Sequence, residues 1–197
     1  MTREEILPIA KPMLYNTEMT IAILDNRKKA TRRIAKGIIP FDDHREYFNV
    51  FRRGEWSGPM TKEQVIEEYA PCKVGDFLYV RETWCNANKP EYAPDYYYFA
   101  DTRICEDYDS SEWTWRPSIH MPKEAARIFL RVTDVRFERL QDMETPNDEN
   151  YIAEGAKDKH DFIRIWNDTV GLDKREIYGW YANPWVWVIE FERIEVQ

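Results

Sequence analysis

Asn26-Arg27-Lys28-Lys29-Ala30-Thr31-Arg32-Arg33 is the stretch around which the chain is organised, because it places five cations and one hydroxyl in eight residues. The whole chain has a formal net charge of −8 and this octet contributes +5, so the other residues carry −13. A compact cationic cluster on an acidic protein predicts attraction for one anionic or polar group, not adhesion to a long polyanion. The alternative is a solvated helix end whose cations lie near the last carbonyl groups, and charge alone favours it.

The composition is that of an ordinary globular protein. The 197 residues are 43% hydrophobic and 32% charged, which is enough for one sizeable core, and we expect a single domain over residues 1–197. No apolar run approaches the roughly 20 residues of a membrane span, and the N-terminus lacks the apolar core of a signal peptide. These features predict a cytoplasmic protein without a membrane partner.

Cysteine spacing bears on metals and on the redox compartment. Cys72, Cys85 and Cys105 lie 13 and 20 residues apart and include no CxxC pair. Such scatter predicts thiols in a reducing compartment and no structural zinc. The acidic residues at 106–109 lack the spacing of a calcium loop, so we expect no metal and no cofactor.

Several segments have the residue pattern of strands. Phe77 to Trp84 is rich in aromatic and β-branched residues, and Arg127 to Leu140 predicts a long strand with a bend near Thr133-Asp134. Trp185 to Val196 alternates, which predicts a strand with a strongly aromatic inner face. Residues 35–58 show no sustained period, and we interpret them as an insertion or a long loop.

Helix signals lie between these strands. Thr61 begins a capping box, Thr145-Pro146 predicts a helix that ends at Gly155 with Glu154 as its last residue, and a further helix is expected from Asp161 to Gly171. None of the elements follows regular βαβ alternation. The pattern predicts an α+β fold in which short helices pack outside a small, mostly antiparallel β-barrel.

The order of these landmarks resembles that of ASCH domains, a family with a PUA-like β-barrel. The octet is similar to the family's GRKTxTxR signature, and later landmarks follow in the family's order: Lys73-Val74-Gly75-Asp76, the Arg127 to Arg139 strand, Ala153-Glu154-Gly155 and Val186 to Phe191. Two stretches, about 35–72 and 86–122, are insertions relative to a minimal domain. The fuller pattern resembles the longer ASCH-like proteins of bacteriophages and prophages, which implies the host cytoplasm as the location.

The resemblance implies an activity. One bacterial branch of the family hydrolyses the acyl amide of N4-acetylcytidine with a lysine and a threonine of the signature and a glutamate of a helix. Matched by motif, these residues are Lys28, Thr31 and Glu154. Two neighbours depart from the signature, because Asn26 replaces glycine and Lys29 replaces threonine. Asparagine tolerates a left-handed turn well, so the first change is mild.

The implied chemistry is reasonable for these residue types. Amide hydrolysis needs a nucleophile, a base that activates it and donors for the oxyanion. Lys28, crowded by cations, would act as base, Thr31 would attack, and Glu154 would transfer a proton or orient the lysine. Arg33 or backbone amides would hold the oxyanion.

Two other functions stay open. One is a non-catalytic PUA-like module that binds RNA or a modified base. In that case tryptophans would stack on the base and arginines would contact phosphate: Trp115, Trp180 or Trp185 with Arg27, Arg32 and Arg33. The acidic net charge argues against binding to bulk double-stranded nucleic acid. The other is a structural or assembly protein of a phage; the sequence predicts no oligomeric state.

Glu82 and His120 are further candidates for ligand binding, and each could instead have a structural role. Glu82 lies on the apolar face of its predicted strand and needs a partner, either Arg33 or Lys28 across a cleft, or a cation at the strand end. His120 could act as acid or base, and a lone histidine also serves as hydrogen-bonded scaffolding.

Overall fold

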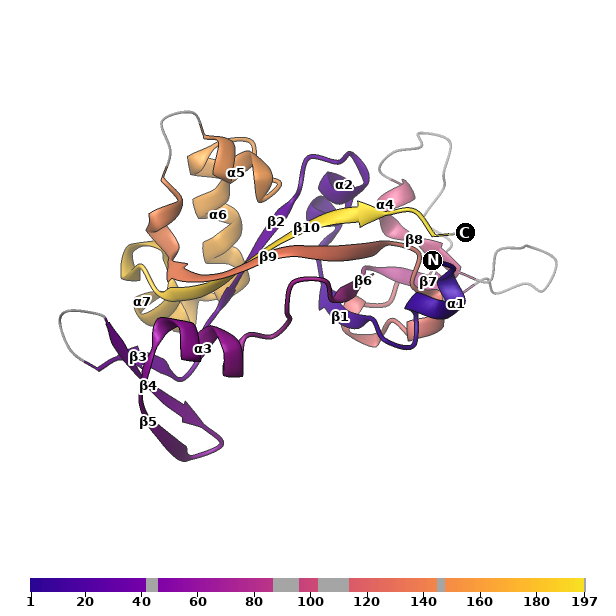
Figure 1. Cartoon of the computed structure of the whole chain (residues 1–197). Coiled ribbons are helices and arrows are strands. Elements are labelled where there is room, and N and C mark those ends of the chain that lie inside the picture. The colour runs from indigo at the N-terminus through magenta and orange to yellow at the C-terminus, as the bar shows by residue number, and fades with distance from the viewer. Residues whose placement is uncertain (42–45, 87–95, 103–113, 145–147, 197) are drawn as a thin grey trace. The chain divides into compact units, whose positions relative to one another are not determined.

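The computed structural model describes residues 1–41, 46–86, 96–102, 114–144 and 148–196 (Figure 1). The chain is a mixed α+β protein that divides into two compact units. Unit 1 contains Met1–Lys28, Gly75–Arg131 and Glu192–Gln197, and unit 2 contains Lys29–Val74 and Val132–Phe191. The boundary between the units therefore falls inside the octet, between its two lysines.

Unit 1 is built on neighbouring strands in the order β1-β6-β9. Its strands β1 and β6 are parallel, and β6 is antiparallel to the first residues of β9. A separate hairpin pairs β7 with β8. The elements are α1 (Arg3–Ile6), β1 (Lys11–Leu14), α2 (Thr17–Leu24), β6 (Phe77–Arg81), β7 (Trp84–Asn86), β8 (Tyr96–Tyr98), α4 (Phe99–Thr102), the 3-10 turns η1 (Ser118–His120) and η2 (Lys123–Ala125), and the start of β9 (Phe129–Arg139).

The core of unit 1 joins the N-terminal helix to the sheet. Ile6, Tyr79, Trp84 and Phe129 are buried in one cluster. Thr2 caps α1 through a capping box, which fixes the helix that delivers Ile6 to this cluster. The predicted strand Phe77 to Trp84 is interrupted after Arg81, because the chain leaves β6 and pairs again only from Trp84 in β7.

Unit 2 contains strands in the order β9-β10-β2 and a three-stranded antiparallel sheet in the order β3-β4-β5. Strands β10 and β2 are antiparallel. The elements are β2 (Ala30–Ile34), β3 (Ile38–Pro40), β4 (Tyr47–Arg52), β5 (Glu55–Thr61), α3 (Lys62–Tyr69), η3 (Leu140–Met143), α5 (Glu149–Ala153), α6 (Lys159–Val170), η4 (Leu172–Lys174), α7 (Arg175–Tyr178), η5 (Trp180–Ala182) and β10 (Trp185–Ile194).

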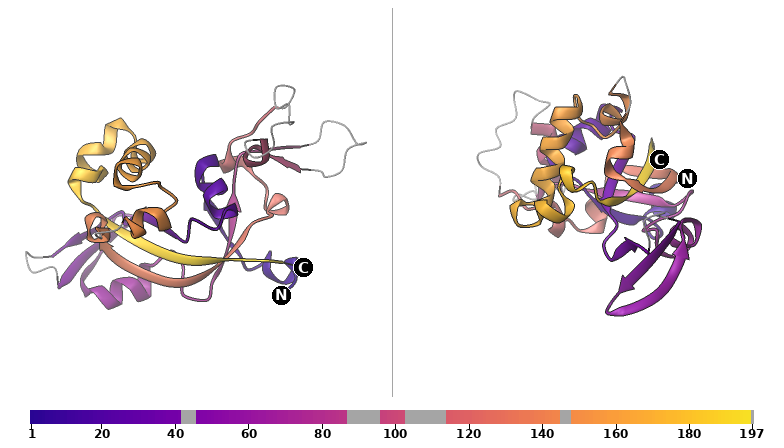
Figure 2. Two further views of the ribbon diagram at one scale, coloured as in Figure 1. Left: turned by 90° about the horizontal axis from the view of Figure 1, so that it is seen from above. Right: turned by 90° about the vertical axis from the view of Figure 1, so that its left-hand side faces the viewer.

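Both faces of β10 are covered in unit 2. Val186 and Val188 pack into the cluster beneath α5 and α6, whereas Trp185 on the other face stacks on Phe137 at 4.7 Å between ring centroids and meets Phe48 of β4. The left view of Figure 2 shows the helices α5 and α6 on one side of these strands and α3 on the other. The sequence predicted one aromatic inner face for this strand, and the structure buries the valine face as well.

The alternative of a long loop for residues 35–58 is wrong, because much of this segment forms β3, β4 and the start of β5. Phe48, Val50 and Met60 are buried on one face of the sheet, and the pairing of β4 with β5 shifts register between Asn49 and Phe51. The segment is short and has turns at Gly37 and Gly54, both with positive φ, so it shows no long period. The capping box at Thr61 and helix α3 are confirmed.

The α+β class is confirmed at this coarse level, and the strands within each unit form open sheets without a closed barrel among the described residues. Cys85 is a buried free thiol and Cys72 is buried as well. Cys105 and the predicted helix start at Thr145-Pro146 lie outside the described residues.

Candidate functional site

The octet begins as a left-handed turn. Helix α2 ends at Leu24, and Asn26 has φ 58°. This is the left-handed conformation that asparagine, which replaces the glycine of the signature, was expected to tolerate. The backbone N–H groups of Arg27 and Lys28 both donate to the carbonyl oxygen of Ala22 at 2.9 Å. These bonds close the helix end. The exposed side chain of Arg27 agrees with the alternative of a solvated helix end, whereas the buried side chain of Lys28 does not.

The adjacent cations Arg27 and Lys28 have different surroundings within unit 1. Arg27 is exposed and its Nη2 lies 3.4 Å from Asp25 Oδ2. Lys28 is only 4% exposed, and its Nζ lies 5.8 Å from the centroid of the Tyr15 ring. A buried ammonium beside an aromatic ring gains cation–π attraction that partly offsets its lost hydration. Burial therefore distinguishes Lys28 from the solvated cations of the octet.

Thr31 lies in strand β2 of unit 2 at 3% exposure, opposite Ile189 of β10. Arg32 follows it, opposite Val188. Because neighbouring side chains of a strand point to opposite faces, Arg32 shares the face of Val188, which packs beneath α5 and α6, and Thr31 takes the other face.

The start of unit 2 is bound to the end of α5. The backbone N–H of Lys29 donates to Ala153 O at 2.7 Å, and Phe191 N–H donates to Lys29 O at 2.9 Å. The helix end that carries Glu154 is therefore fixed beside the first residues of β2. This main-chain arrangement brings Glu154 within reach of an octet side chain.

That side chain is Arg32. Its Nη1 lies 2.9 Å from Glu154 Oε1, and both side chains are at most 5% exposed. Glu138 of β9 lies further away, 3.9 Å from Arg32 Nη2. A buried carboxylate is stabilised in its ionised form by such a charge-assisted hydrogen bond. The sequence predicted phosphate contact for Arg32 and gave no sign of this ion pair.

A row of charged side chains extends from Arg32 and Glu138 along β9 of unit 2. Arg136 donates to Glu138 and to Glu190 at 2.7 Å each and also pairs with Asp134. Burial opposes the charge of Arg136, but the hydrogen bonds to Glu190, Glu138 and Asp134 outweigh it and raise the pKa of the guanidinium. The row joins β9, β10 and β2 by charges on one sheet face.

Glu82 in unit 1 is paired with Arg127. Glu82 is 1% exposed, and its two carboxylate oxygens accept hydrogen bonds from Arg127 Nε and Nη2 at 2.9 and 3.0 Å. Arg127 also donates to Asp101 at 2.8 Å, and its guanidinium lies 3.9 Å from the centroid of the Tyr98 ring. Burial raises the pKa of Glu82, and the hydrogen bonds from Arg127 only partly oppose that shift.

This geometry bears on the two alternatives for Glu82. The described partner is an arginine just before β9, which agrees with the alternative of a cation at a strand end. The sequence signal was available, because a carboxylate on an apolar strand face requires a cation. What the sequence lacked was the antiparallel pairing of β6 with β9, which brings Arg127 to it.

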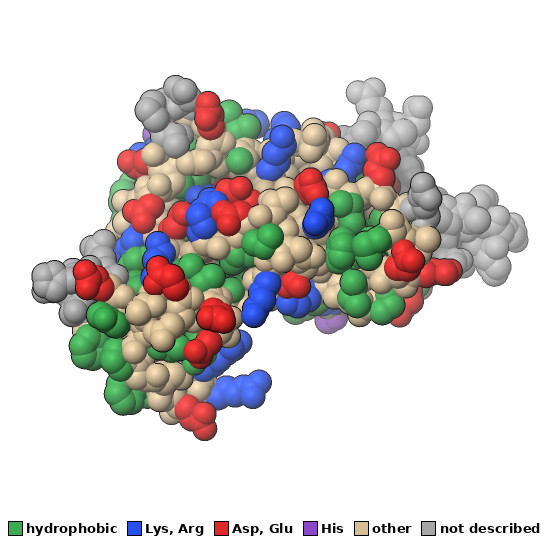
Figure 3. Space-filling model, in the orientation of Figure 1, with side chains coloured by type: hydrophobic (Ala, Val, Ile, Leu, Met, Phe, Trp, Pro, Cys, Tyr) green, Lys and Arg blue, Asp and Glu red, His purple; other side chains and the backbone are tan. Residues whose placement is uncertain are grey.

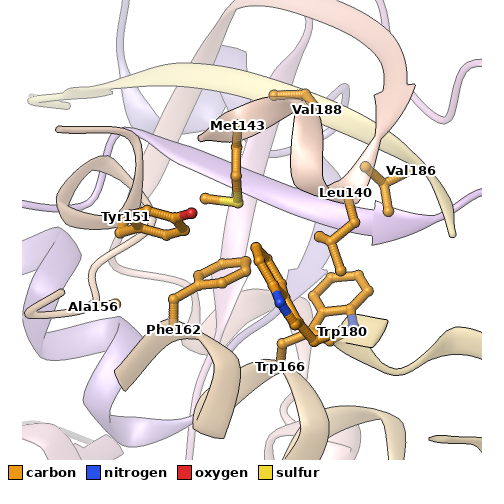
Figure 4. Close-up of a cluster of buried hydrophobic side chains, with 9 residues drawn as sticks. All are labelled: Leu140, Met143, Tyr151, Ala156, Phe162, Trp166, Trp180, Val186 and Val188. Carbon is orange, nitrogen blue, oxygen red and sulfur yellow. The ribbon is translucent and has the colours of Figure 1, made fainter. Parts of the chain in front are cut away.

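The remaining candidates occupy different surroundings. Trp180 is 4% exposed inside a hydrophobic cluster of unit 2 that also contains Tyr151, Phe162 and Trp166 (Figure 4). Its ring therefore packs in a core. In unit 1, Trp115 is half-buried against Phe99 at 5.1 Å between centroids, and His120 is exposed in η1. Arg33 is half-buried in β2 opposite Trp187.

Clustered metal ligands and long apolar helices are both absent from the described residues. They contain no group of three or more histidine, cysteine, aspartate or glutamate side chains arranged to hold a metal ion. None of the described helices combines the length and hydropathy needed to cross a bilayer. Comparisons with protein families, with curated proteins and with solved structures found no match to this chain.

Proposed function

We propose that the protein hydrolyses the acyl amide of a modified nucleoside, with N4-acetylcytidine as the test substrate. One observation carries this proposal. The described residues include six buried polar or charged side chains: Thr20, Lys28, Thr31, Arg32, Glu82 and Glu154. Three of them, Lys28, Thr31 and Glu154, are the proposed catalysts. Burying such groups costs free energy, and ionisable groups in these surroundings are concentrated at functional sites.

Each proposed catalyst has one role. The Thr31 hydroxyl attacks the amide carbon while neutral Lys28 accepts its proton and then delivers it to the leaving N4 amine. Water hydrolyses the resulting threonine ester and releases acetate. Glu154, kept ionised by Arg32 on the face of β2 opposite Thr31, has the proposed role of orienting Lys28, the second role that the sequence left open. The buried pair thus favours the charged form of the carboxylate that this role requires.

We also propose that the chain belongs to the ASCH family. The support for this proposal is the octet with its ordered landmarks in the sequence, and the α+β class of the described chain agrees with it. A PUA-like barrel and membership of the ASCH family are thus part of the proposal, as is a nucleoside or RNA ligand.

The test is release of acetate and cytidine from N4-acetylcytidine by purified protein, followed by chromatography. We expect turnover in the wild type and a loss of at least about 100-fold in Lys28→Ala and Thr31→Ala, because each removes a group that acts in the chemical step. Lys29→Ala is the matched control, since the neighbouring lysine is exposed and should retain activity. No turnover across a panel of acylated nucleosides would sink the proposal.

A ligand-holding module for a modified base is the second candidate. The Arg32–Glu154 ion pair favours it, because a carboxylate that already has a buried cationic partner also serves as a static hydrogen-bond acceptor. The same preparation distinguishes the two candidates. Saturable binding of the acylated nucleoside without release of acetate would favour the module.

A further inference from the structure

The three-stranded sheet of unit 2 leaves one face open. The β3–β4 and β4–β5 registers place five large apolar side chains on that face, which we call the aromatic face: Ile39, Phe41, Tyr47, Phe51 and Trp56. Their exposed fractions range from 43% to 58%. Figure 3 shows hydrophobic side chains gathered over β3, β4 and β5.

The opposite face of the same sheet is core, so the exposure follows from the register. Ile38, Phe48 and Val50 alternate with the aromatic face and are at most 6% exposed. The Phe48 ring packs edge-on against Phe137 at 5.1 Å and against Trp185 at 4.8 Å. A one-residue slip of a strand would expose this core, so the register that buries it also fixes the aromatic face outward.

The most exposed ring of the aromatic face is held in place. Trp56 Nε1 donates to Asn49 Oδ1 at 2.9 Å, although the residue is 58% exposed. Phe51 lies directly across the hairpin from it. An exposed tryptophan whose orientation is already fixed loses little conformational entropy when a partner covers it, which is a property of interface hot spots.

We propose that a second copy of this chain packs on the aromatic face through a two-fold contact. The proposal does not rest on the proposed activity. Side chains of this size present about 150–250 Å² each, so the half-exposed set offers roughly 400–600 Å² per copy. Two such faces bury on the order of 1,000 Å² together, which reaches the lower limit of specific interfaces.

The charges at the two ends of β4 are self-complementary. Glu46 is exposed just before this strand, and Arg53 is exposed in the turn just after it. Neither forms an ion pair with another described residue. A two-fold contact that runs the β4 strands of the two copies antiparallel brings Arg53 of one copy toward the partner's Glu46, and the reverse.

Two observations favour face-to-face packing of copies over other occupants. Strand β5 is an edge strand that contains Gly58 and Pro59, and proline in an edge strand blocks the addition of another strand. The chain carries a net charge of −8, which opposes the approach of a polyanion such as single-stranded nucleic acid. An apolar face on an acidic chain instead suits a second apolar face.

The test is the molar mass of the full chain in solution, measured by size-exclusion chromatography with light scattering. We expect about twice the 23.8 kDa of one chain for the wild type and a monomer for Trp56→Asp. Tyr181→Asp is the matched control, because Tyr181 is an aromatic residue with 89% exposure outside the aromatic face and its replacement should leave the dimer intact. Circular dichroism would verify that each variant is folded.

A charge reversal tests the orientation independently. Arg53→Glu and Glu46→Arg should each weaken the dimer at least about 10-fold in its dissociation constant, and the double variant should recover most of that loss. A monomeric wild type at about 100 µM would overturn the proposal, as would a dimer that survives both Trp56→Asp and Arg53→Glu. A monomer that instead binds an oligonucleotide through Trp56 would overturn it in favour of that occupant.

Discussion

Arg32 and Glu154, which are 122 residues apart in the sequence, form an ion pair with 2.9 Å between Nη1 and Oε1 and almost no exposure of either side chain. Arg32 lies in β2, two residues after its start at Ala30, and Glu154 is the C-cap residue of α5. The pair therefore links the octet to the helix that carries the proposed catalytic carboxylate.

Arg32→Ala should destabilise unit 2 strongly. The substitution removes the Arg32 side of a buried ion pair with Glu154, and breaking a buried pair from one side typically costs about 3–5 kcal/mol. The free energy of unfolding from urea denaturation measures it. Arg27→Ala is the control, because this exposed octet arginine should change the stability by no more than about 0.5 kcal/mol. Equal effects of the two variants would contradict the assignment.

Asn26 tests the left-handed turn at the start of the octet. Asn26→Ala should cost about 1 kcal/mol, because a Cβ-bearing residue without a side-chain hydrogen-bonding group is strained at φ 58°. Asn26→Gly should be neutral or slightly stabilising in the native state, since glycine adopts this conformation without strain. Thermal denaturation of both variants measures the difference, and a destabilisation by glycine as large as that by alanine would exclude the turn.

Glu82 predicts a pH dependence of stability. The pKa of Glu82 is raised above its ordinary value of 4.5, chiefly by burial. The folded state therefore holds the proton more tightly than the unfolded state, so the contribution of this group is fully present below pH 4.5 and is lost as the pH rises through the folded pKa. The stability of the wild type minus that of Glu82→Gln should fall over this interval in urea titrations. A difference that rises with pH would reverse the sign.

The hydroxyls of Tyr151, which is buried, and Tyr98, which is half-buried, differ in their hydrogen bonding. Tyr151 is 1% exposed, and its hydroxyl has no hydrogen-bond partner among the described residues. Tyr151→Phe should therefore be neutral or stabilise the protein by about 1 kcal/mol. Tyr98 donates to Ala125 O at 2.6 Å, so Tyr98→Phe should cost about 1 kcal/mol. Thermal unfolding would show both, and an equal loss in the two variants would mean that Tyr151 has a hydrogen-bond partner.

Alkaline titration provides a second test at Tyr98. Burial raises the pKa of this phenol from 10.0 to about 12, and the opposing charge of Arg127 reduces the shift only partly. The neutral phenol is favoured in the folded state, so its contribution to stability is lost as the pH rises from about 10 toward 12. The stability of the wild type minus that of Tyr98→Phe should decline across this range, whereas a constant difference would contradict the shift.

Local signals in the sequence predicted several elements correctly. The capping box at Thr61 predicts the start of helix α3 at the next residue, and asparagine at position 26 is compatible with the left-handed turn that the structure has there. Strand β10 follows from a run of alternating aromatic and β-branched residues. Each of these depends on neighbours in the chain, so the sequence alone determined it.

Only the tertiary structure decided the partners. The sequence indicated that Glu82 needs a cation, and the antiparallel pairing of β6 with β9 selected Arg127. Arg32 became the partner of Glu154 because β2 starts beside the end of α5. The sheet of β3, β4 and β5 was missed because its strands are short and gain their stability from Phe137 and Trp185, far along the chain. The sign of each charge and the local backbone conformation depend on residues close together in the sequence. The burial of a side chain and the choice of its partner depend on contacts between distant segments, which form only when the chain folds.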